Sequence, residues 1–226
     1  MERVFIFGAG GLGSVAFDVL HQTGRYEPVA FFDNDIEKHG RAVDGLLVRG
    51  ALSELLALAR RERAGVLVAV GDNADRVVIA EQVRGAGLRL VSAIHPSAAI
   101  SPSAILDEHV LLGPRATICV HARIGAHAVI SAGAIVEHDV GIGAGAFLHP
   151  AVRLAGGVTI GPGATLGIGA AVIPGRRIGR GAVVAPGAVV IRDVPEHGNC
   201  AGVPGRITCG ASASAARATA SIALAR

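Results

Sequence analysis

Aliphatic residues recur at every sixth position from Ile94 to Val190. The series holds 17 residues, all of them Val, Ile or Leu, without an exception or an insertion. Its members are Ile94, Ile100, Leu106, Leu112, Ile118, Ile124, Ile130, Val136, Ile142, Leu148, Leu154, Ile160, Leu166, Val172, Ile178, Val184 and Val190. A fixed period sustained over this length indicates a repeat architecture rather than a single helix or strand.

A second column of small apolar residues lies four positions after the first and runs from Ala98 to Ala188. Two apolar positions separated by one outward residue form a short strand. The Gly and Pro residues that are frequent in the rest of each hexad favour a tight corner. One strand and one corner per hexad predict a triangular coil, and thus a parallel β-helix. A β-sandwich would need longer apolar runs and variable loops.

Arg176 departs from this small apolar column. A guanidinium inside a dry prism would be costly without a partner. The preceding Pro174 and Gly175 offer a place where the backbone can deviate, since Gly accepts conformations closed to other residues. We therefore expect a local bulge that turns Arg176 outward, next to Arg177.

Residues 1–93 show a different pattern, in which strand-like and helix-like segments alternate. The predicted strands are 3–7, 28–32, 66–70 and 88–93, and the predicted helices are 14–23, 52–63 and 75–85. Such alternation predicts a parallel sheet. The chain should therefore divide into a Rossmann-like α/β domain over 1–93, a β-helix domain over 94–194, and a C-terminal extension and tail over 195–226.

The glycine-rich segment Gly8–Gly13 follows the pattern G-x-G-x-x-G and lies between a predicted strand and a predicted helix. There it can cradle a phosphate at the helix N-terminus. Asp33, which follows Gly13 by 20 residues, stands where dinucleotide folds carry a ribose-binding carboxylate. However, roughly 90 residues form one mononucleotide half of such a fold. A mononucleotide-type ligand is favoured over NAD, and a plain tight turn is the remaining interpretation.

The composition narrows the range of partners. Aromatic residues make up 3% of the chain and no run of basic residues occurs, so nucleic acid is a poor candidate despite a net charge of +3. The three cysteines form neither a disulfide framework nor a zinc pattern, which favours a reducing compartment. The N-terminus lacks the build of a signal peptide, and no apolar stretch reaches the ~18 residues of a membrane span. A cytoplasmic protein without membrane contact is expected.

Several motifs occur together in this chain: the Gly8–Gly13 loop, Asp33-Asn34, Val70-Gly71-Asp72-Asn73, Ile94-His95-Pro96-Ser97-Ala98, the hexads, and Gly202-Val203-Pro204-Gly205-Arg206. Over residues 1 to about 208 the chain thus resembles the sialic acid O-acetyltransferase family, which includes N-acetyltransferases of nucleotide-linked 4-amino sugars. The resemblance implies a left-handed β-helix, acetyl-CoA as co-substrate, and a homotrimer with active sites between subunits. It also implies that a nucleotide-linked sugar binds at Gly10, Gly11, Leu12, Asp33, Asn34, Gly71 and Asp72.

In this family the catalytic histidine lies between acidic residues, and the matching positions here are Glu137, His138 and Asp139. Histidine titrates close to neutral pH and can take a proton from an amine or hydroxyl that attacks a thioester. A neighbouring carboxylate can orient the ring and stabilise its charged form. His138 follows Val136 by two residues and should point outward from a corner, below an open space at Gly156.

The chain departs from the family pattern at Leu12 and at Phe147. Many members have His where Leu12 stands, and many have a second His at the position of Phe147. His149 lies two residues further on and can take over part of that role. The resemblance assigns acetyl-CoA contacts to Phe147, His149, Gly156 and Ile168, and Arg176 with Arg177 lies near the expected path of the CoA phosphates.

A metal site is not expected, because the successive histidines His121, His127, His138 and His149 are 6, 11 and 11 residues apart. The β-helix carbonic anhydrases need a pair five residues apart. The leading functional hypothesis is N-acetylation of a nucleotide-linked amino sugar, with His138 as general base. The alternatives are O-acetylation of a sialic-acid-like sugar and a non-catalytic trimeric scaffold or nucleotide sensor. The sequence leaves the nucleotide, whether UDP, GDP or CMP, undecided.

Overall fold

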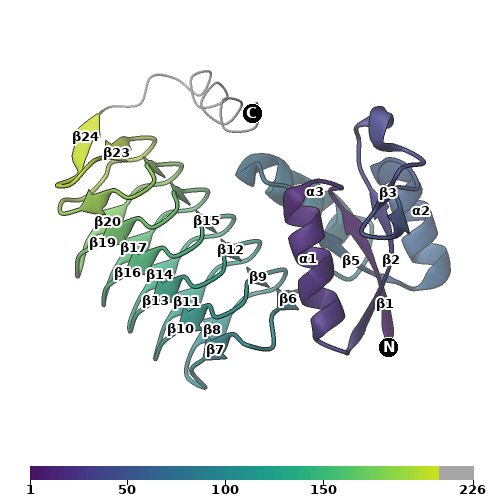
Figure 1. Ribbon diagram of the computed structural model, residues 1–226, viewed down its shortest axis with the longest axis horizontal. Helices are drawn as coiled ribbons and strands as arrows, with labels where there is room; N and C mark the ends of the chain where they lie inside the picture. Colours follow the sequence, from purple (N-terminus) through teal and green to yellow (C-terminus); the bar gives the residue numbers. More distant parts are fainter. Residues whose placement is uncertain (209–226) are drawn as a thin grey trace.

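The structure is a computed structural model that describes residues 1–208. A small α/β unit lies beside a long parallel β-helix, and Figure 1 shows the two parts next to each other. The predicted tail over 209–226, with Cys209, lies outside the described residues. No helix within residues 1–208 is both long and apolar enough to cross a membrane.

A three-stranded parallel sheet of order β2-β1-β5 forms the centre of the α/β unit. Its elements are β1 (Glu2–Phe7), α1 (Gly11–Gln22), β2 (Tyr26–Phe32), the short 3-10 helix η1 (Ile36–Lys38), β3 (Ala42–Val43), β4 (Leu46–Leu47), α2 (Leu52–Glu62), β5 (Gly65–Val68) and α3 (Asn73–Gly85). On one face of β1, Val4 and Ile6 pack with α1. On the other face, Phe5 and Phe7 pack with α2 and α3. Both faces are therefore covered, as a parallel sheet requires.

The predicted strand over 88–93 is reduced to a bridge between Leu90 and Val66. Val91 still donates its N–H to the carbonyl of Val66. The chain cannot follow β5 further, because Ala93 already begins the first strand of the β-helix. This predicted strand was wrong, whereas the other predicted strands and helices are confirmed to within three residues at each end.

Strands of two residues each, and of three at the C-terminal end, stack to form the three faces of the β-helix. The first face contains β6 (Ala93–Ile94), β9 (Leu111–Leu112), β12 (Val129–Ile130), β15 (Phe147–Leu148), β18 (Thr165–Leu166), β21 (Val183–Val184), β23 (Asn199–Ala201) and the antiparallel β24 (Arg206–Thr208). The second contains β7 (Ala99–Ile100), β10 (Thr117–Ile118), β13 (Ile135–Val136), β16 (Arg153–Leu154), β19 (Ala171–Val172) and β22 (Val189–Val190). The third contains β8 (Ile105–Leu106), β11 (Arg123–Ile124), β14 (Gly141–Ile142), β17 (Thr159–Ile160) and β20 (Arg177–Ile178). The predicted left-handed β-helix is confirmed.

Each of the 17 predicted aliphatic residues is the second residue of one of these strands. Those from Leu112 onward are buried in one continuous core. Ile94, Ile100 and Leu106 are partly buried instead, because they form the first coil and have no coil beneath them. The expectation that all 17 are buried is therefore wrong for the first coil.

From His109 to Gly187, one residue at each successive corner of the prism adopts a left-handed backbone with φ between 54° and 69°. The first corner, between the first and second faces, has Arg115, Gly133, Ala151, Gly169 and Gly187. The second corner, between the second and third faces, has His121, Asp139, Gly157 and Gly175. The third corner has His109, His127, Gly145, Gly163 and Gly181. Asp and His tolerate this conformation better than β-branched residues do, so functional side chains can be placed there.

Serine hydroxyls of the first coil accept hydrogen bonds from backbone N–H groups of the coil above. In the coils above, the corner N–H groups donate to carbonyls of the coil below, as Asp139 does to Val120. In the first coil, Ser97 and Ser103 accept instead from the N–H groups of Arg115 and His121, each 18 residues further on. Ser92 likewise accepts from Val110. The lowest corner amides are therefore satisfied by side chains.

The outward orientation predicted for Arg176 is confirmed, since 39% of its side chain is exposed. Its Nε donates to the carbonyl of Pro174 at 3.3 Å and lies 4.0 Å from Asp193 Oδ1. The predicted bulge is wrong, because Thr159 still donates to the Arg176 carbonyl at 3.0 Å. The following coil is two residues shorter, since Ile178 pairs with Val194, and Asp193 of that coil meets the guanidinium.

The α/β unit packs against the first face of the β-helix. Leu111, Val129 and Phe147 of this face share a buried cluster with residues of β1 and α1. His95, in the first coil, places its Nε2 atom 2.9 Å from Gln22 Oε1 at the end of α1. These contacts fix which face, and therefore which corners, lie beside the Gly8–Gly13 loop.

Candidate active site

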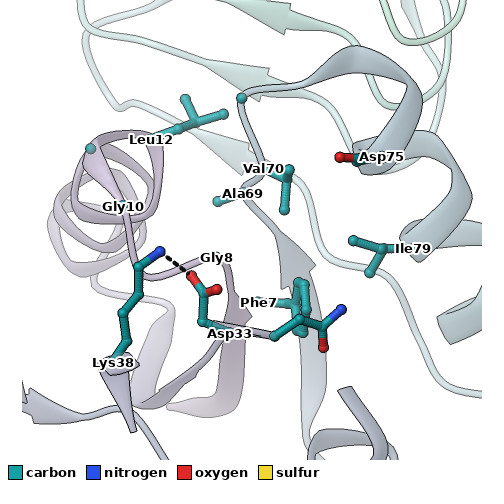
Figure 2. A pocket seen from close by; sticks show the side chains of 13 residues that line it. Phe7, Gly8, Gly10, Leu12, Asp33, Lys38, Ala69, Val70, Asp75 and Ile79 are labelled. Atoms are coloured by element: carbon teal, nitrogen blue, oxygen red, sulfur yellow. Dashed lines mark hydrogen bonds and ion pairs between the residues drawn. The ribbon is translucent and has the colours of Figure 1, made fainter. Parts of the chain in front are cut away.

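A pocket of about 380 Å³ lies at the carboxyl ends of β1, β2 and β5 (Figure 2). Ligands of open parallel sheets bind at this edge. Its lining residues are Phe7, Gly8, Gly10, Gly11, Leu12, Asp33, Asn34, Lys38, Ala69, Val70, Gly71, Asp75 and Ile79. The structure thus brings together six of the seven residues that the resemblance assigns to the nucleotide sugar.

The glycines of the Gly8–Gly13 loop serve two purposes. A side chain on Gly8, whose φ is +109°, would overlap the carbonyl oxygen of Ala69, and one on Gly13 would overlap the carbonyl of Gly8. These two glycines permit close packing. At Gly10 and Gly11, by contrast, a methyl group would have no other atom within 4 Å, so their bare backbone leaves room for a ligand.

Helix α1 begins directly above this space. Gly10 is its N-cap residue and provides no side-chain hydrogen bond to the first-turn amides. The first turn also contains no acidic residue. An anionic group is favoured at such an end, because the amides and the helix dipole both attract it. The arrangement can therefore hold a phosphate.

Asp33 forms the opposite wall and is held by three donors. Its Oδ2 atom accepts from the N–H of Ala9 at 2.9 Å and from Lys38 Nζ at 2.8 Å, and its Oδ1 atom accepts from the N–H of Asp35 at 2.9 Å. Burial alone would raise the pKa of Asp33, but these hydrogen bonds, led by that from Lys38, lower it. The wall thus carries a fixed carboxylate.

Asp72 has a different place from the one the sequence predicts. Its Oδ1 atom accepts from the N–H groups of Ala74 and Asp75 and so caps α3. Lys38 and Asp75 line the pocket although the sequence did not predict them there. Asp75 lies three residues after Asp72, in the first turn of α3. That spacing could have indicated that Asp75 lines the pocket.

His138 and Asp139 form a hydrogen-bonded pair at the second corner. The distance from His138 Nδ1 to Asp139 Oδ2 is 2.9 Å, and the hydrogen bond from His138 is the main cause that lowers the pKa of Asp139. His138 N–H also donates to Glu137 Oε2 at 3.4 Å. With Nδ1 donating to the carboxylate, Nε2 is left as the proton-accepting atom of the ring.

A second histidine faces the same carboxylate. His121 lies one coil below Asp139, and its Nδ1 atom is 3.4 Å from Asp139 Oδ1. The carboxylate therefore lies between two imidazole rings. This contact was not predicted, although the separation of one full coil between His121 and Asp139 could have indicated it.

Gly156 lies directly above His138, but the open space predicted there is wrong, because the His138 ring occupies it. A methyl group at Gly156 would overlap Cε1 and Nε2 of the His138 ring. Glycine at this position therefore makes room for the imidazole ring itself.

The other residues assigned to acetyl-CoA lie elsewhere on the coils. Phe147 is 9% exposed, because the α/β unit covers it. Its ring stacks on His149, with centroids 4.3 Å apart and planes at 6°. Burial lowers the pKa of His149, which keeps that ring neutral at neutral pH. Ile168 is 57% exposed.

The pocket in the α/β unit and the His138–Asp139 pair lie beside different corners of the β-helix. The α/β unit contacts the first face and the third corner, where Gly145 approaches Val77 of α3. His138 and Asp139 belong to the turn between β13 and β14, which is the second corner. Among residues 1–208 no group of three or more His, Cys, Asp or Glu side chains forms a metal site.

The chain matches known proteins over both parts. The family model of the PglD N-terminal domain matches residues 3–83. A variant of GDP-perosamine N-acetyltransferase from Caulobacter crescentus, solved with CoA and GDP-perosamine, is 40% identical with a TM-score of 0.86, over 92% of this chain and 97% of that one. The acetyltransferase domain of PglB from Neisseria gonorrhoeae, solved with acetyl coenzyme A, is 29% identical with a TM-score of 0.85, over 92% and 99% of the two chains.

WeeI from Acinetobacter baumannii shares the fold, with 23% identity and a TM-score of 0.72 over 92% of this chain and all of that one. The match to the Caulobacter enzyme covers the α/β unit and the hexads alike. At 40% identity across 92% of its length, the chain belongs to the hexapeptide-repeat family that unites the sialic acid O-acetyltransferases with the N-acetyltransferases of nucleotide-linked amino sugars, and it is an acyltransferase.

Proposed function

We propose that this acyltransferase moves the acetyl group of acetyl-CoA to the amino group of a nucleotide-linked amino sugar. The observation that carries the proposal is the His138–Asp139 pair, in which Nδ1 bonds the carboxylate and Nε2 is left to accept a proton. The pocket with its fixed Asp33 and its uncapped helix end supplies a separate place for the nucleotide. The complexes of the Caulobacter and Neisseria relatives support this pairing of substrates.

His138 acts as general base. The acceptor nitrogen attacks the thioester carbonyl, and Nε2 of His138 removes a proton from that nitrogen while the N–C bond forms. Asp139 stabilises the resulting imidazolium through Nδ1. When the C–S bond breaks, the imidazolium returns the proton to the departing thiolate, so CoA leaves as the thiol and the base is restored. A sugar hydroxyl would follow the same path and give an O-acetyl product.

The active site forms between two copies of the chain. Within one chain the nucleotide pocket lies by the third corner and His138 at the second, so the same chain does not bring them together. In a closed ring of three chains, a corner of one prism can face the α/β unit of its neighbour. We therefore propose a homotrimer in which each site combines the pocket of one subunit with His138 of the next.

The test of the activity is a mass-spectrometric assay of GDP-, UDP- and CMP-linked 4-amino sugars with acetyl-CoA. We expect one acceptor to gain a single acetyl group, and a His138→Ala variant to lose about 10²–10⁴-fold in turnover. Matched 4-hydroxy sugars distinguish N- from O-acetylation. Transfer by His138→Ala at the wild-type rate would remove the histidine from the mechanism.

Subunit mixing tests the shared site. His138→Ala and a pocket variant such as Gly10→Leu should each be inactive alone. After the two are unfolded and refolded together in equal amounts, about a quarter of the sites should pair an intact pocket with an intact histidine. Recovery of activity near that level supports a site between subunits, whereas no recovery contradicts it.

A further inference from the structure

Arg76, on α3, is a buried cation that the mechanism above does not use. Its exposed fraction is 1%, and among residues 1–208 it forms no ion pair with a carboxylate. Toward the α/β unit, Nη1 donates to the carbonyl of Val70 at 3.0 Å and lies 3.5 Å from that of Gly71. Nη2 donates to Asn73 Oδ1 at 2.8 Å. Val70 and Gly71 are part of the pocket wall.

The same guanidinium binds the β-helix. Nε donates to the carbonyl of His127 at 3.0 Å, and Nη2 donates to the carbonyl of Gly145 at 2.8 Å. Both carbonyls belong to the left-handed row of the third corner. The guanidinium carbon also lies 5.6 Å from the centre of the Phe147 ring. One side chain therefore joins the pocket wall to two successive coils.

Other contacts also hold α3 close to the third corner of the β-helix. A methyl group on Gly145 would lie 2.6 Å from Val77 Cγ2, so glycine at this corner lets α3 come near. Asn73 Nδ2 donates to the carbonyl of Gly163 at 3.0 Å and to Thr165 Oγ1 at 2.9 Å. The N-terminal turn of α3 is thus bonded to three successive coils.

The charge of Arg76 restricts the geometry of the contact between α3 and the β-helix. Burial lowers the pKa of Arg76 to about 10, so the group stays charged at neutral pH. Its charge is balanced by carbonyl dipoles, and the planar fork satisfies its donors only in one arrangement. Buried charges are rarely a net source of stability compared with apolar residues. A residue of this kind is better suited to fixing the position of the pocket wall than to holding the fold together.

We infer that Arg76 is a positioning residue for acetyl transfer, one that sets the Val70–Gly71 wall of the acceptor pocket in register with the β-helix. The inference rests on the proposed function. In the proposed trimer, a wall fixed on its own prism is also fixed relative to His138 of the next subunit. Through Phe147, which stacks on His149, Arg76 also borders the residues assigned to acetyl-CoA.

The test is Arg76→Lys, with Arg84→Lys as matched control. Arg84 lies on the same helix, but 45% of its side chain is exposed and it pairs with Glu81 and Glu108. Lysine keeps the charge of Arg76 but cannot reproduce the fork. We expect kcat of Arg76→Lys to fall by about 10- to 100-fold, because misplacement of about 1 Å costs this much. The KM values for both substrates should change by less than about threefold, and Arg84→Lys should match the wild type.

Asn73→Ala provides a second variant that keeps the Arg76 side chain. It removes one acceptor of Arg76 and two bonds to the β-helix, so kcat should fall by about 3- to 10-fold. All rates are measured per folded trimer, well below the melting temperature. Wild-type kcat in both variants would overturn the inference while leaving the proposed function intact. Absence of turnover in the wild type with every acceptor would overturn the proposed function, and this inference with it.

Discussion

The Nδ1 atoms of His109 and His127 lie 2.9 Å apart, although each residue is only 3% exposed. Val68 N–H donates to His109 Nε2 at 2.9 Å, so the proton of His109 lies on Nδ1 and is donated to His127 Nδ1. His127 Nε2 in turn donates to Glu81 Oε1 at 3.1 Å. Both tautomers are therefore fixed by their neighbours, and both rings are neutral.

Acid should weaken the contact between the α/β unit and the β-helix. Burial lowers the pKa of His109 to about 3, and burial likewise lowers that of His127. Below a pH of about 6.5 the unfolded chain binds protons that the folded chain does not. The free energy of unfolding should be highest above pH 6.5 and should fall as the pH drops toward 3, by up to about 1.4 kcal/mol per histidine and pH unit.

Urea unfolding between pH 8 and pH 4 measures this dependence. His109→Asn should be less stable at pH 8 but should lose less stability on acidification. His121→Asn is the control, because His121 has the same left-handed backbone (φ 59°) and 68% of its side chain is exposed. An acid dependence in His109→Asn equal to that of the wild type would contradict the assignment.

Gly156→Ala should impair catalysis without unfolding the protein. The added methyl group overlaps the His138 ring, so Nε2 must move from its place, and kcat should fall by about 10²-fold. Gly141→Ala is the matched control, since no atom lies within 4 Å of its methyl position. Steady-state kinetics of the two variants give the comparison, and equal rates would show that His138 does not need this space.

Asp139→Asn should lower kcat and leave the fold unchanged. Asparagine accepts the left-handed backbone at this position (φ 58°) but carries no charge to stabilise the imidazolium. We expect a loss of about 10²-fold in kcat at neutral pH, with little change in the KM for acetyl-CoA. Retention of the full rate would mean that His138 works without its carboxylate partner.

Gly10→Leu should block the acceptor and spare acetyl-CoA. The backbone of Gly10 (φ −118°, ψ −169°) suits any L-residue, and its side-chain position is open to the pocket. Calorimetry should show nucleotide-sugar binding weakened by at least about tenfold, with acetyl-CoA binding and melting temperature unchanged. Gly8→Ala should instead lower the melting temperature, because its methyl group overlaps Ala69.

The β-helix could be predicted in detail because its core is a local pattern. Each coil repeats the same choice of one aliphatic and one small residue, so a period of six translates directly into strands. Arg176 shows what the repeat pattern can and cannot predict. Its outward orientation follows from the cost of burying charge, but the partner, Asp193, depends on a coil that is two residues shorter, and the repeat does not foretell that.

The candidate site could be predicted from the sequence where its residues are contiguous, and not where it depends on the packing of the α/β unit against the β-helix. The Gly8–Gly13 loop and the His138–Asp139 pair are local motifs. Arg76 resembles, in the sequence, an ordinary polar residue of an amphipathic helix. Its burial, and that of His127, arises because α3 meets a corner 51 residues further along the chain, and no spacing within either segment specifies that meeting.

The serine hydroxyls of the first coil give the repeat a defined beginning. Ser97 and Ser103 do for this solenoid what a capping residue does for an α-helix, since their hydroxyls accept from corner amides of the second coil that would otherwise bond a backbone carbonyl. Above the first coil, the β-helix is built from repeated turns of the same kind. Evolution or design can therefore add or remove whole 18-residue turns beyond the active-site coils, and the length of the enzyme can vary while its chemistry stays at the same height above a fixed base.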